Sequence, residues 1–331
     1  MAEAGTGFTL ATLRRRERAV ALSVVAFVVV AVVAGALVGG PEVLGYLARV
    51  SPGLLATLLA LSGANYLLRA LRWHLYGRAI GVLLPFRRTL LYYIAGFALT
   101  TTPGRVGEAL RLWLIARGHG YRYDRLAALL VGDRLSDVHA IVVLAAIGAA
   151  WSAGNTLLVA MAAGVALALT VVLAHPAWAI ALAGAAHDAL GRRWRRPFAR
   201  IRRALRHTGR LFNGRVAVAG LGLAIGGWLG ECLAFYILLA GFGAEVTPIA
   251  AGSVFALATL MGAVAMLPGG LGGAEVTMVG LLIALGVDPG AAVAATAVIR
   301  LTTLWFAVGL GFIALPLALR GLRRPMTVPA A

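Results

Sequence analysis

Long apolar stretches dominate the chain, and a proline–glycine pair interrupts them twice. Apolar runs of about 20 residues recur, and each is long enough to cross a bilayer as a helix. The interruptions are Pro103-Gly104-Arg105-Val106-Gly107-Glu108 and Pro268-Gly269-Gly270-Leu271-Gly272-Gly273-Ala274-Glu275. Pro and Gly break helices, and broken backbone is tolerated at membrane depth only where it is buried in protein or lines a cavity. Two such breaks, each followed by a glutamate, therefore predict a functional site.

The residues around the two breaks repeat at nearly the same spacing. Asn65 lies 38 residues before the first proline, and Glu231 lies 37 before the second. Arg134 lies 31 residues after the first proline, and Arg300 lies 32 after the second. Such paired, interrupted segments in two halves point to the binding site of a transporter. We therefore interpret the chain as an internal duplication.

The composition defines the class of protein. The 331 residues are 61% hydrophobic and only 13% charged, with a mean hydropathy of +0.91, whereas soluble domains carry about 25% charged residues. The runs are continuous and do not alternate as barrel strands do. We expect one all-α polytopic integral membrane domain over residues 1–331. The single cysteine, Cys232, excludes an intramolecular disulfide.

The apolar runs predict about six full spans. We place them at residues 20–38, 52–71, 126–150, 156–173, 216–240 and 291–319. The first is too long for the apolar region of a signal peptide, and we expect it to be retained. Residues 176–190 are apolar but short, which favours an interfacial helix. Basic and aromatic residues at the end of the second span indicate the membrane interface: Arg69, Arg72-Trp73-His74 and Arg78.

The distribution of arginine predicts the topology. The formal net charge is +18, and all 30 basic residues are arginines. The positive-inside rule places both termini in the cytoplasm. It also places residues 192–215 there, because ten arginines mixed with apolar residues form a basic amphipathic loop. This charge is explained by topology and anionic headgroups, so we expect no nucleic-acid partner; a lipid-sensing role for the loop is an alternative.

The charges beside the breaks favour two re-entrant hairpins. If residues 89–116 were one kinked span, Arg117, Arg122 and Arg125 would lie outside, whereas a hairpin returns them to the cytoplasm. Residues 249–285 are flanked by Glu245 and Asp288, so this hairpin should enter from outside. Repeat one (51–150) and repeat two (216–319) would then be inverted repeats.

Charged residues inside apolar segments are the candidates for substrate binding, because each costs about 2.5–3.5 kcal/mol at the centre of a span. With the glycines of the breaks, the candidates are Gly104, Arg105, Glu108, Arg111, Asp133, Arg134, Asp137, Glu231, Gly269, Gly270, Glu275 and Arg300. The simpler interpretation is that these charges neutralise one another and lock helices together. The glycines could equally serve tight helix packing.

The breaks themselves suggest the chemistry of the ligand. A half-helix that starts after a break presents free N–H groups and a positive dipole end, which bind phosphate well. Guanidinium groups add donors that suit phosphate oxygens. Glu108 and Glu275 could pair with the arginines, accept a cationic headgroup or carry a coupling proton. The sequence lacks a metal-ligand spacing, a nucleophile motif and a nucleotide-binding loop, so we expect neither an enzyme nor a cofactor or metal.

The motifs together resemble a known family. Asn65, Leu71-Arg72-Trp73, the first break, Asp133-Arg134 with Asp137, and the second break with Glu275 and Arg300 are similar to the lysylphosphatidylglycerol synthase transmembrane-domain, or flippase-like, family. The resemblance covers roughly residues 15 to 322. It implies a polytopic inner-membrane protein that moves lipids between leaflets. The best-known members carry an aminoacyl-transferase domain after this region; this sequence ends shortly after Arg324, so aminoacyl transfer is not expected.

These observations lead to one leading hypothesis and two alternatives. The leading hypothesis is a flippase of the cytoplasmic membrane for an anionic or phosphate-bearing lipid: a phospholipid, a glycolipid or a polyprenyl-phosphate-linked lipid. The first alternative is a membrane partner that presents lipid to a separate transferase without transporting it. The second is a small-anion or proton-coupled solute carrier.

Overall fold

The computed structural model describes residues 42–102, 106–152, 160–161, 164, 211, 214–264 and 268–322. All regular structure in these ranges is helical. The predicted span at 20–38 and the segment 176–190 lie outside the described residues. So do the predicted span at 156–173, apart from residues 160–161 and 164, and almost all of the loop 192–215. The elements are α2 (Glu42–Ala48), α3 (Pro52–Ala79), α4 (Phe86–Ala95), η1 (Gly96–Leu99), α5 (Val106–His119), α6 (Tyr123–Ser152), α10 (Gly214–Gly241), α11 (Pro248–Val264), η4 (Pro268–Gly270), α12 (Gly273–Ala284), α13 (Pro289–Arg300), η5 (Leu301–Trp305) and α14 (Phe306–Leu322).

The long helices begin where the sequence places helix-starting residues. Ser51 caps α3 by accepting a hydrogen bond from the Leu54 amide at 3.1 Å, and Pro52 follows it. Asp288 caps α13 in the same way. Three described helical stretches are long and apolar enough to cross a membrane: Pro52–Ala79, Gly214–Gly241 and Pro289–Leu322. The second predicted span continues about two turns further than the apolar run suggested, because α3 ends only at Ala79.

The helices on either side of each break pack against each other as a helical hairpin. In the first, α5 packs against α4 and η1, and in the second, α12 packs against α11. Gly107 allows the first hairpin to close, since a Cβ atom there would collide with the Gly96 carbonyl oxygen. Gly269 and Gly270 turn the second with φ angles of +65° and +70°, which glycine adopts without strain. Their entry into a membrane from opposite sides stays a prediction.

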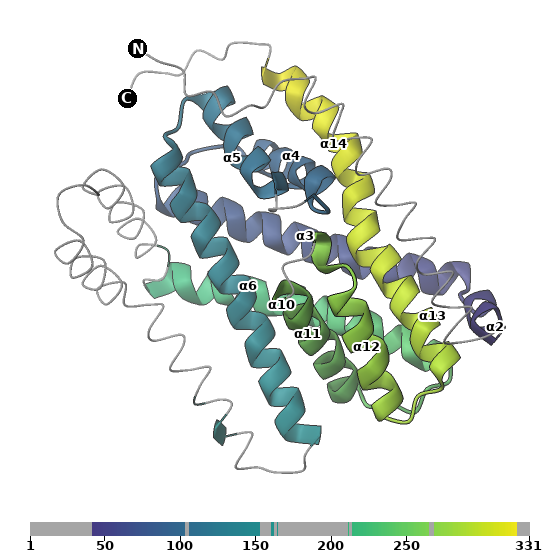
Figure 1. Ribbon diagram of the computed structural model, residues 1–331. Coiled ribbons are helices and arrows are strands. Elements are labelled where there is room, and N and C mark those ends of the chain that lie inside the picture. The colour runs from purple at the N-terminus through teal and green to yellow at the C-terminus, as the bar shows by residue number, and fades with distance from the viewer. Residues whose placement is uncertain are drawn as a thin grey trace, which may run out of the picture.

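Two packed halves meet along α3 and α10. These helices lie against each other, and Figure 1 shows α4 and α5 on one side of α3, with α11 and α12 on the other. One apolar core surrounds α4, α5 and α14, and a second joins α10, α11 and α13. The second break lies close to the residues that precede the first, since a Cβ atom at Gly269 would lie 3.3 Å from Thr101 Cγ2.

Candidate functional site

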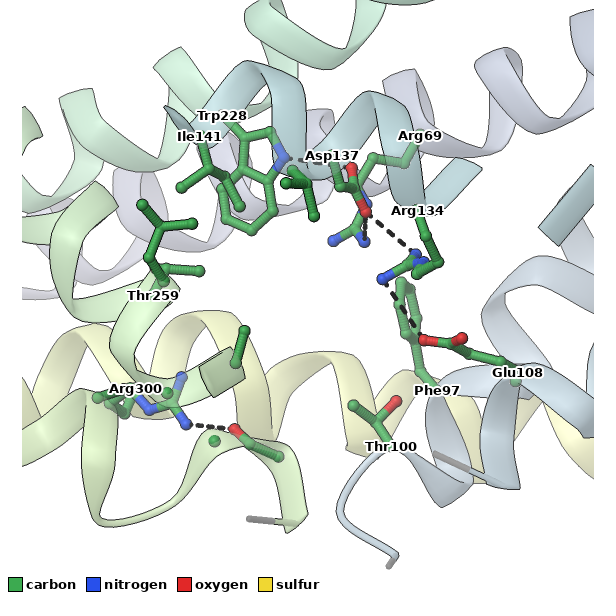
Figure 2. A pocket seen from close by; sticks show the side chains of 18 of the residues that line it. Arg69, Phe97, Thr100, Glu108, Arg134, Asp137, Ile141, Trp228, Thr259 and Arg300 are labelled. Carbon is green, nitrogen blue, oxygen red and sulfur yellow. Dashed lines mark hydrogen bonds and ion pairs between the residues drawn. The ribbon is translucent and has the colours of Figure 1, made fainter. Parts of the chain in front are cut away.

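A cavity of about 300 Å³ lies between the two breaks (Figure 2). Both hairpins and the helices α3, α6, α10 and α13 contribute to its wall. Its polar lining consists of Arg69, Thr100, Glu108, Arg111, Arg134, Asp137, Trp228, Thr259 and Arg300. Its apolar lining includes Phe97, Val138, Ile141, Leu260, Ala263 and Ala274, with Gly96, Gly262, Gly269 and Gly270. A pocket with an apolar wall and a few convergent polar groups is typical of a ligand site.

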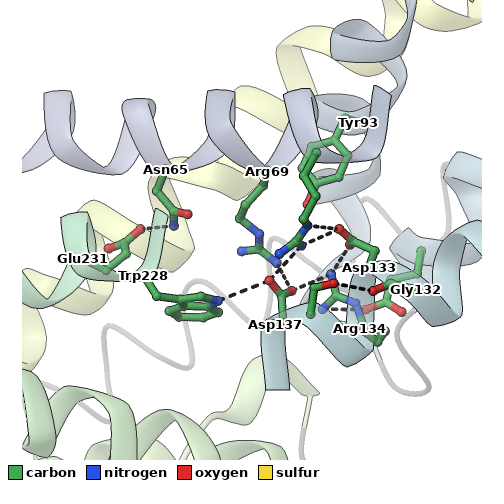
Figure 3. Close-up of polar contacts among 12 residues, drawn as sticks. Asn65, Arg69, Tyr93, Gly132, Asp133, Arg134, Asp137, Trp228 and Glu231 are labelled. Atoms are coloured by element: carbon green, nitrogen blue, oxygen red, sulfur yellow. Dashed lines mark hydrogen bonds and ion pairs between the residues drawn. The ribbon is translucent and has the colours of Figure 1, made fainter. Parts of the chain in front are cut away.

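An arginine–carboxylate network occupies one wall of the cavity (Figure 3). Arg72 donates from Nε to Asp133 at 3.0 Å and from Nη2 to Asp137 at 2.8 Å. Arg134 pairs with the same two carboxylates at 2.7 and 3.0 Å and reaches Glu108 at 3.4 Å. Every carboxylate in this wall is therefore paired with at least one arginine.

Two further residues complete the network from α3 and α10. Arg69 donates to Asp137 at 2.8 Å. The Trp228 indole N–H donates to the same carboxylate at 3.2 Å, and the Arg69 guanidinium lies 5.4 Å from the Trp228 ring. The charges in this wall therefore balance. The three acids are Asp133, Asp137 and Glu108, and the three arginines are Arg69, Arg72 and Arg134.

The interpretation of Arg69 and Arg72 as interface residues is wrong. Arg72 is 0% exposed and pairs with two carboxylates, Asp133 and Asp137. The helix continues to Ala79, so Arg72 lies two turns inside its end. Steps of four and three put Asn65, Arg69 and Arg72 on one helix face. This spacing was the signal in the sequence that could have assigned both arginines to the polar centre.

The second break is held by its own ion pair. Arg300 Nε donates to Glu275 at 2.6 Å, and its Nη2 donates to the Gly269 carbonyl at 2.8 Å. The other Glu275 oxygen accepts from the Gly272 amide at 2.7 Å, which caps α12. The amide end that we expected to bind an anion is therefore engaged by a carboxylate of the protein. At this break, the charges of Arg300 and Glu275 cancel.

Arg111 differs from the other arginines of the site. It is 3% exposed, and no carboxylate within the described residues pairs with it. Its Nε donates to the Tyr93 carbonyl at 3.1 Å, while Nη1 has no hydrogen-bond partner. The guanidinium lies 3.8, 4.9 and 5.8 Å from the ring centres of Tyr93, Phe97 and Trp73. Aromatic faces hold its charge in place, and the residue lines the cavity.

A count of charge follows from these contacts. Five arginines stand in and behind the cavity wall: Arg69, Arg72, Arg111, Arg134 and Arg300. Four acids pair with them: Glu108, Asp133, Asp137 and Glu275. The described arginine network therefore carries a net charge of 5 − 4 = +1, and Arg111 is the arginine without a carboxylate.

The structure brings most of the predicted site residues together. Seven of the twelve line the cavity: Glu108, Arg111, Arg134, Asp137, Gly269, Gly270 and Arg300. Asp133, Glu231 and Glu275 lie behind the wall and do not line it. Gly104 and Arg105 lie outside the described residues. Besides Arg69 and Arg72, sequence reasoning missed Phe97, Thr100 and Trp228. Such residues are common in apolar segments, so a single sequence does not mark them as cavity residues.

The comparison with known proteins places this site in a family. A family model described as the lysylphosphatidylglycerol synthase TM region matches residues 19–311. The chain belongs to this family. In this lysylphosphatidylglycerol synthase TM-region protein, the matched residues include both breaks and every residue that lines the cavity.

Two relatives are proteins of the archaeon Methanothermobacter thermautotrophicus, and both are described as a UPF0104 membrane protein. One is 27% identical over 314 residues, which covers 87% of this chain and 92% of the relative. The other is 39% identical over 91 residues, or 28% of this chain and 27% of the relative. The first similarity extends over nearly the whole of both proteins, so it concerns the complete helical assembly.

Proposed function

We propose that this protein is a flippase that moves lipids with an anionic, phosphate-bearing headgroup between the leaflets of the cytoplasmic membrane. The observation that carries this proposal is the cavity between the two breaks, with Arg111 as its uncompensated charge. The headgroup occupies the cavity, and the acyl or isoprenoid tail stays in the surrounding lipid. Both breaks line the cavity, so both halves of the protein contact the headgroup.

The state of Arg111 explains why an anion is the ligand. Burying a charge without a partner costs free energy. Only a close opposite charge offsets the cost of removing it from water. Arg111 lines the cavity, and its buried Nη1 makes no hydrogen bond within the described protein. A phosphodiester oxygen accepts from a guanidinium with good geometry. One phosphodiester carries one negative charge and balances the net charge of the arginine network.

The duplicated architecture supplies a route between the leaflets. In transporters built from inverted repeats, the two halves rock about a fixed central site and open it to each side in turn. Here the glycine-rich break at Gly269 and Gly270 and the hairpin closed by Gly107 meet at the cavity. The family description names a lipid synthase region, which agrees with a lipid as the occupant.

The test is headgroup translocation in reconstituted vesicles. Phosphatidylcholine vesicles that contain the protein receive a trace of acyl-labelled fluorescent phosphatidylglycerol, and a membrane-impermeant reductant bleaches the outer leaflet. We expect Arg111→Met to slow translocation by about 10- to 100-fold, the value of a hydrogen bond to a charged group. Arg122→Met is the matched control, because Arg122 is 76% exposed and pairs with Asp124 away from the cavity.

Three results would contradict the proposal. Protein-containing vesicles that bleach no further than empty vesicles would favour a lipid-presenting partner. Uptake of radiolabelled inorganic phosphate without lipid translocation would favour a solute carrier. Equal rates for Arg111→Met and the parent protein would remove Arg111 from the mechanism.

A further inference from the structure

Glu231 is a buried acid that stands apart from the arginine network. It lies on α10, is 2% exposed, and no arginine of the described chain lies within ion-pair distance of it. Its contacts are neutral: the Asn65 Nδ2 donates to it at 2.6 Å (Figure 3), and the Ser62 hydroxyl donates at 3.5 Å. A carboxylate in such surroundings has no structural counter-charge, so its charge is not required to hold helices together.

The Asn65 side chain can form a hydrogen bond with Glu231 in both protonation states of the carboxyl group. An asparagine amide carries both a donor and an acceptor. In the present arrangement the Asn65 Nδ2 donates, and the buried Oδ1 has no hydrogen-bond partner. If Glu231 binds a proton, rotation of the amide would place Oδ1 where it accepts from the new O–H group. Either state of the carboxyl then keeps a hydrogen bond at this position.

The surroundings of Glu231 connect it to the cavity. Arg69 lies one turn beyond Asn65 on α3, and Trp228 lies one turn before Glu231 on α10; both line the cavity. The charged residues that act on Glu231 electrostatically are Arg69 and, from the end of α13, Arg300.

The other titratable groups around Glu231 come from the helices packed on α10. From α3 and from α10 itself, Tyr66 and Cys232 are the neighbours that can titrate. From α6, Asp137 accepts the Trp228 indole N–H and faces this region. Helix α11 carries no titratable side chain. Arginine is therefore the only cation that faces Glu231 among the described residues, and it does so from the cavity wall.

The count of charges shows what a proton at this position does. Among the described residues, the arginine network carries +1 without Glu231, and an ionised Glu231 brings their summed charge to 0. A proton on Glu231 restores the net charge of +1 and strengthens the attraction for an anion in the cavity. By linkage, an anion in the cavity strengthens proton binding by the same factor.

We propose that Glu231 is a proton-binding site whose occupancy is coupled to the headgroup in the cavity. This inference rests on the proposed function. Glu231 takes up one proton from water as an anionic headgroup enters and releases it as the headgroup leaves. The headgroup and the proton cross together as a neutral pair, and a proton gradient drives the lipid.

Proton uptake on binding tests the coupling directly. Purified protein in weakly buffered detergent solution is mixed with short-chain phosphatidylglycerol, and a pH indicator reports protons taken up. We expect about one proton per bound lipid for the parent protein and none for Glu231→Gln, by the linkage above. Glu245→Gln, at an exposed loop acid, is the matched control and should behave as the parent. Glu231→Asp keeps a carboxyl and should keep the uptake, which separates loss of the proton from loss of folding.

Two further measurements separate this inference from the proposed function. Infrared difference spectra of lipid-free protein on acidification should show a carboxylic acid band that Glu231→Gln removes. In vesicles, an imposed pH gradient should accelerate translocation by the parent and not by Glu231→Gln. If translocation occurs but the band, the uptake or the gradient response survives in Glu231→Gln, the inference fails while the flippase stands. If no lipid is translocated and the band depends on Glu231, the flippase fails while the proton site stands.

Discussion

The Arg300 guanidinium donates to the Glu275 carboxylate at 2.6 Å, across 25 residues of sequence. Arg134 and Glu108 form the corresponding pair at 3.4 Å, and they are separated by 134 − 108 = 26 residues. Each break is thus joined to the following long helix by the same kind of pair. Asn65 and Glu231, which occupy equivalent positions before the breaks, contact each other. A two-fold axis between α3 and α10 would bring such equivalent residues together, which supports the duplication.

If the repeats are inverted, the loops before the two hairpins lie on opposite sides of the membrane. In a Cys232→Ala background, Leu83→Cys should react with an impermeant maleimide only from the cytoplasmic side. Glu245→Cys should react only from the outside, and both positions are exposed. Labelling of oriented vesicles before and after permeabilisation gives the answer, and reaction of both cysteines from one side would exclude inverted repeats.

Removing Arg72 should lower stability, whereas removing Arg111 should not. Arg72→Met leaves Asp133 and Asp137 with fewer partners in a buried site, and breaking a buried pair costs about 3–5 kcal/mol. Arg111→Met removes a buried charge that pairs with no described carboxylate, so we expect no loss of stability. Thermal unfolding in detergent compares the two. A larger loss of stability for Arg111→Met than for Arg72→Met would indicate that Arg111 stabilises the fold and does not serve to bind a ligand.

The sequence predicted the parts of the site that depend on local spacing. The breaks at Pro103 and Pro268 interrupt membrane-length hydrophobicity, and the repeated spacing of Arg134 and Arg300 from the two prolines marked these arginines as candidates. The partners of Arg72 could not be predicted in this way, because its carboxylates lie on α6, 61 and 65 residues away. The unpaired state of Arg111 depends on three aromatic rings from α3, α4 and η1, and only tertiary packing brings them together.

Gly269 should tolerate a side chain poorly, although the substitution adds only one methyl group. Its φ angle of +65° costs an L-residue about 1–2 kcal/mol, and the new Cβ would press on Thr101 at 3.3 Å. We expect Gly269→Ala to lower stability by that amount and to slow translocation, because Gly269 lines the cavity. Gly280→Ala is the control: it lies within α12 with open space around it and should be neutral or stabilising by up to about 1 kcal/mol. Equal thermal stability of the two variants would show that the close approach of Gly269 to Thr101 is not maintained.

The pair between Glu275 and Arg300 should behave as one unit in a double-mutant cycle. Glu275→Gln removes the carboxylate that holds Arg300 and caps α12 at the Gly272 amide, and Arg300→Gln leaves Glu275 partly buried without its cation. Each single variant therefore leaves a charge uncompensated, whereas the double variant leaves none. We expect the double variant to be less destabilised than the sum of the singles, with a coupling energy of about 0.5–3 kcal/mol.

The exposed pair of Arg122 and Asp124 provides the matched cycle, and its effects should be additive because solvent screens it. Chemical unfolding in detergent measures all of the variants under one condition. Additivity at Glu275 and Arg300 would mean that solvent or lipid headgroups already replace the missing partner at the second break. The break would then be open to its surroundings even without a substrate, and the ion pair would not be what holds it closed.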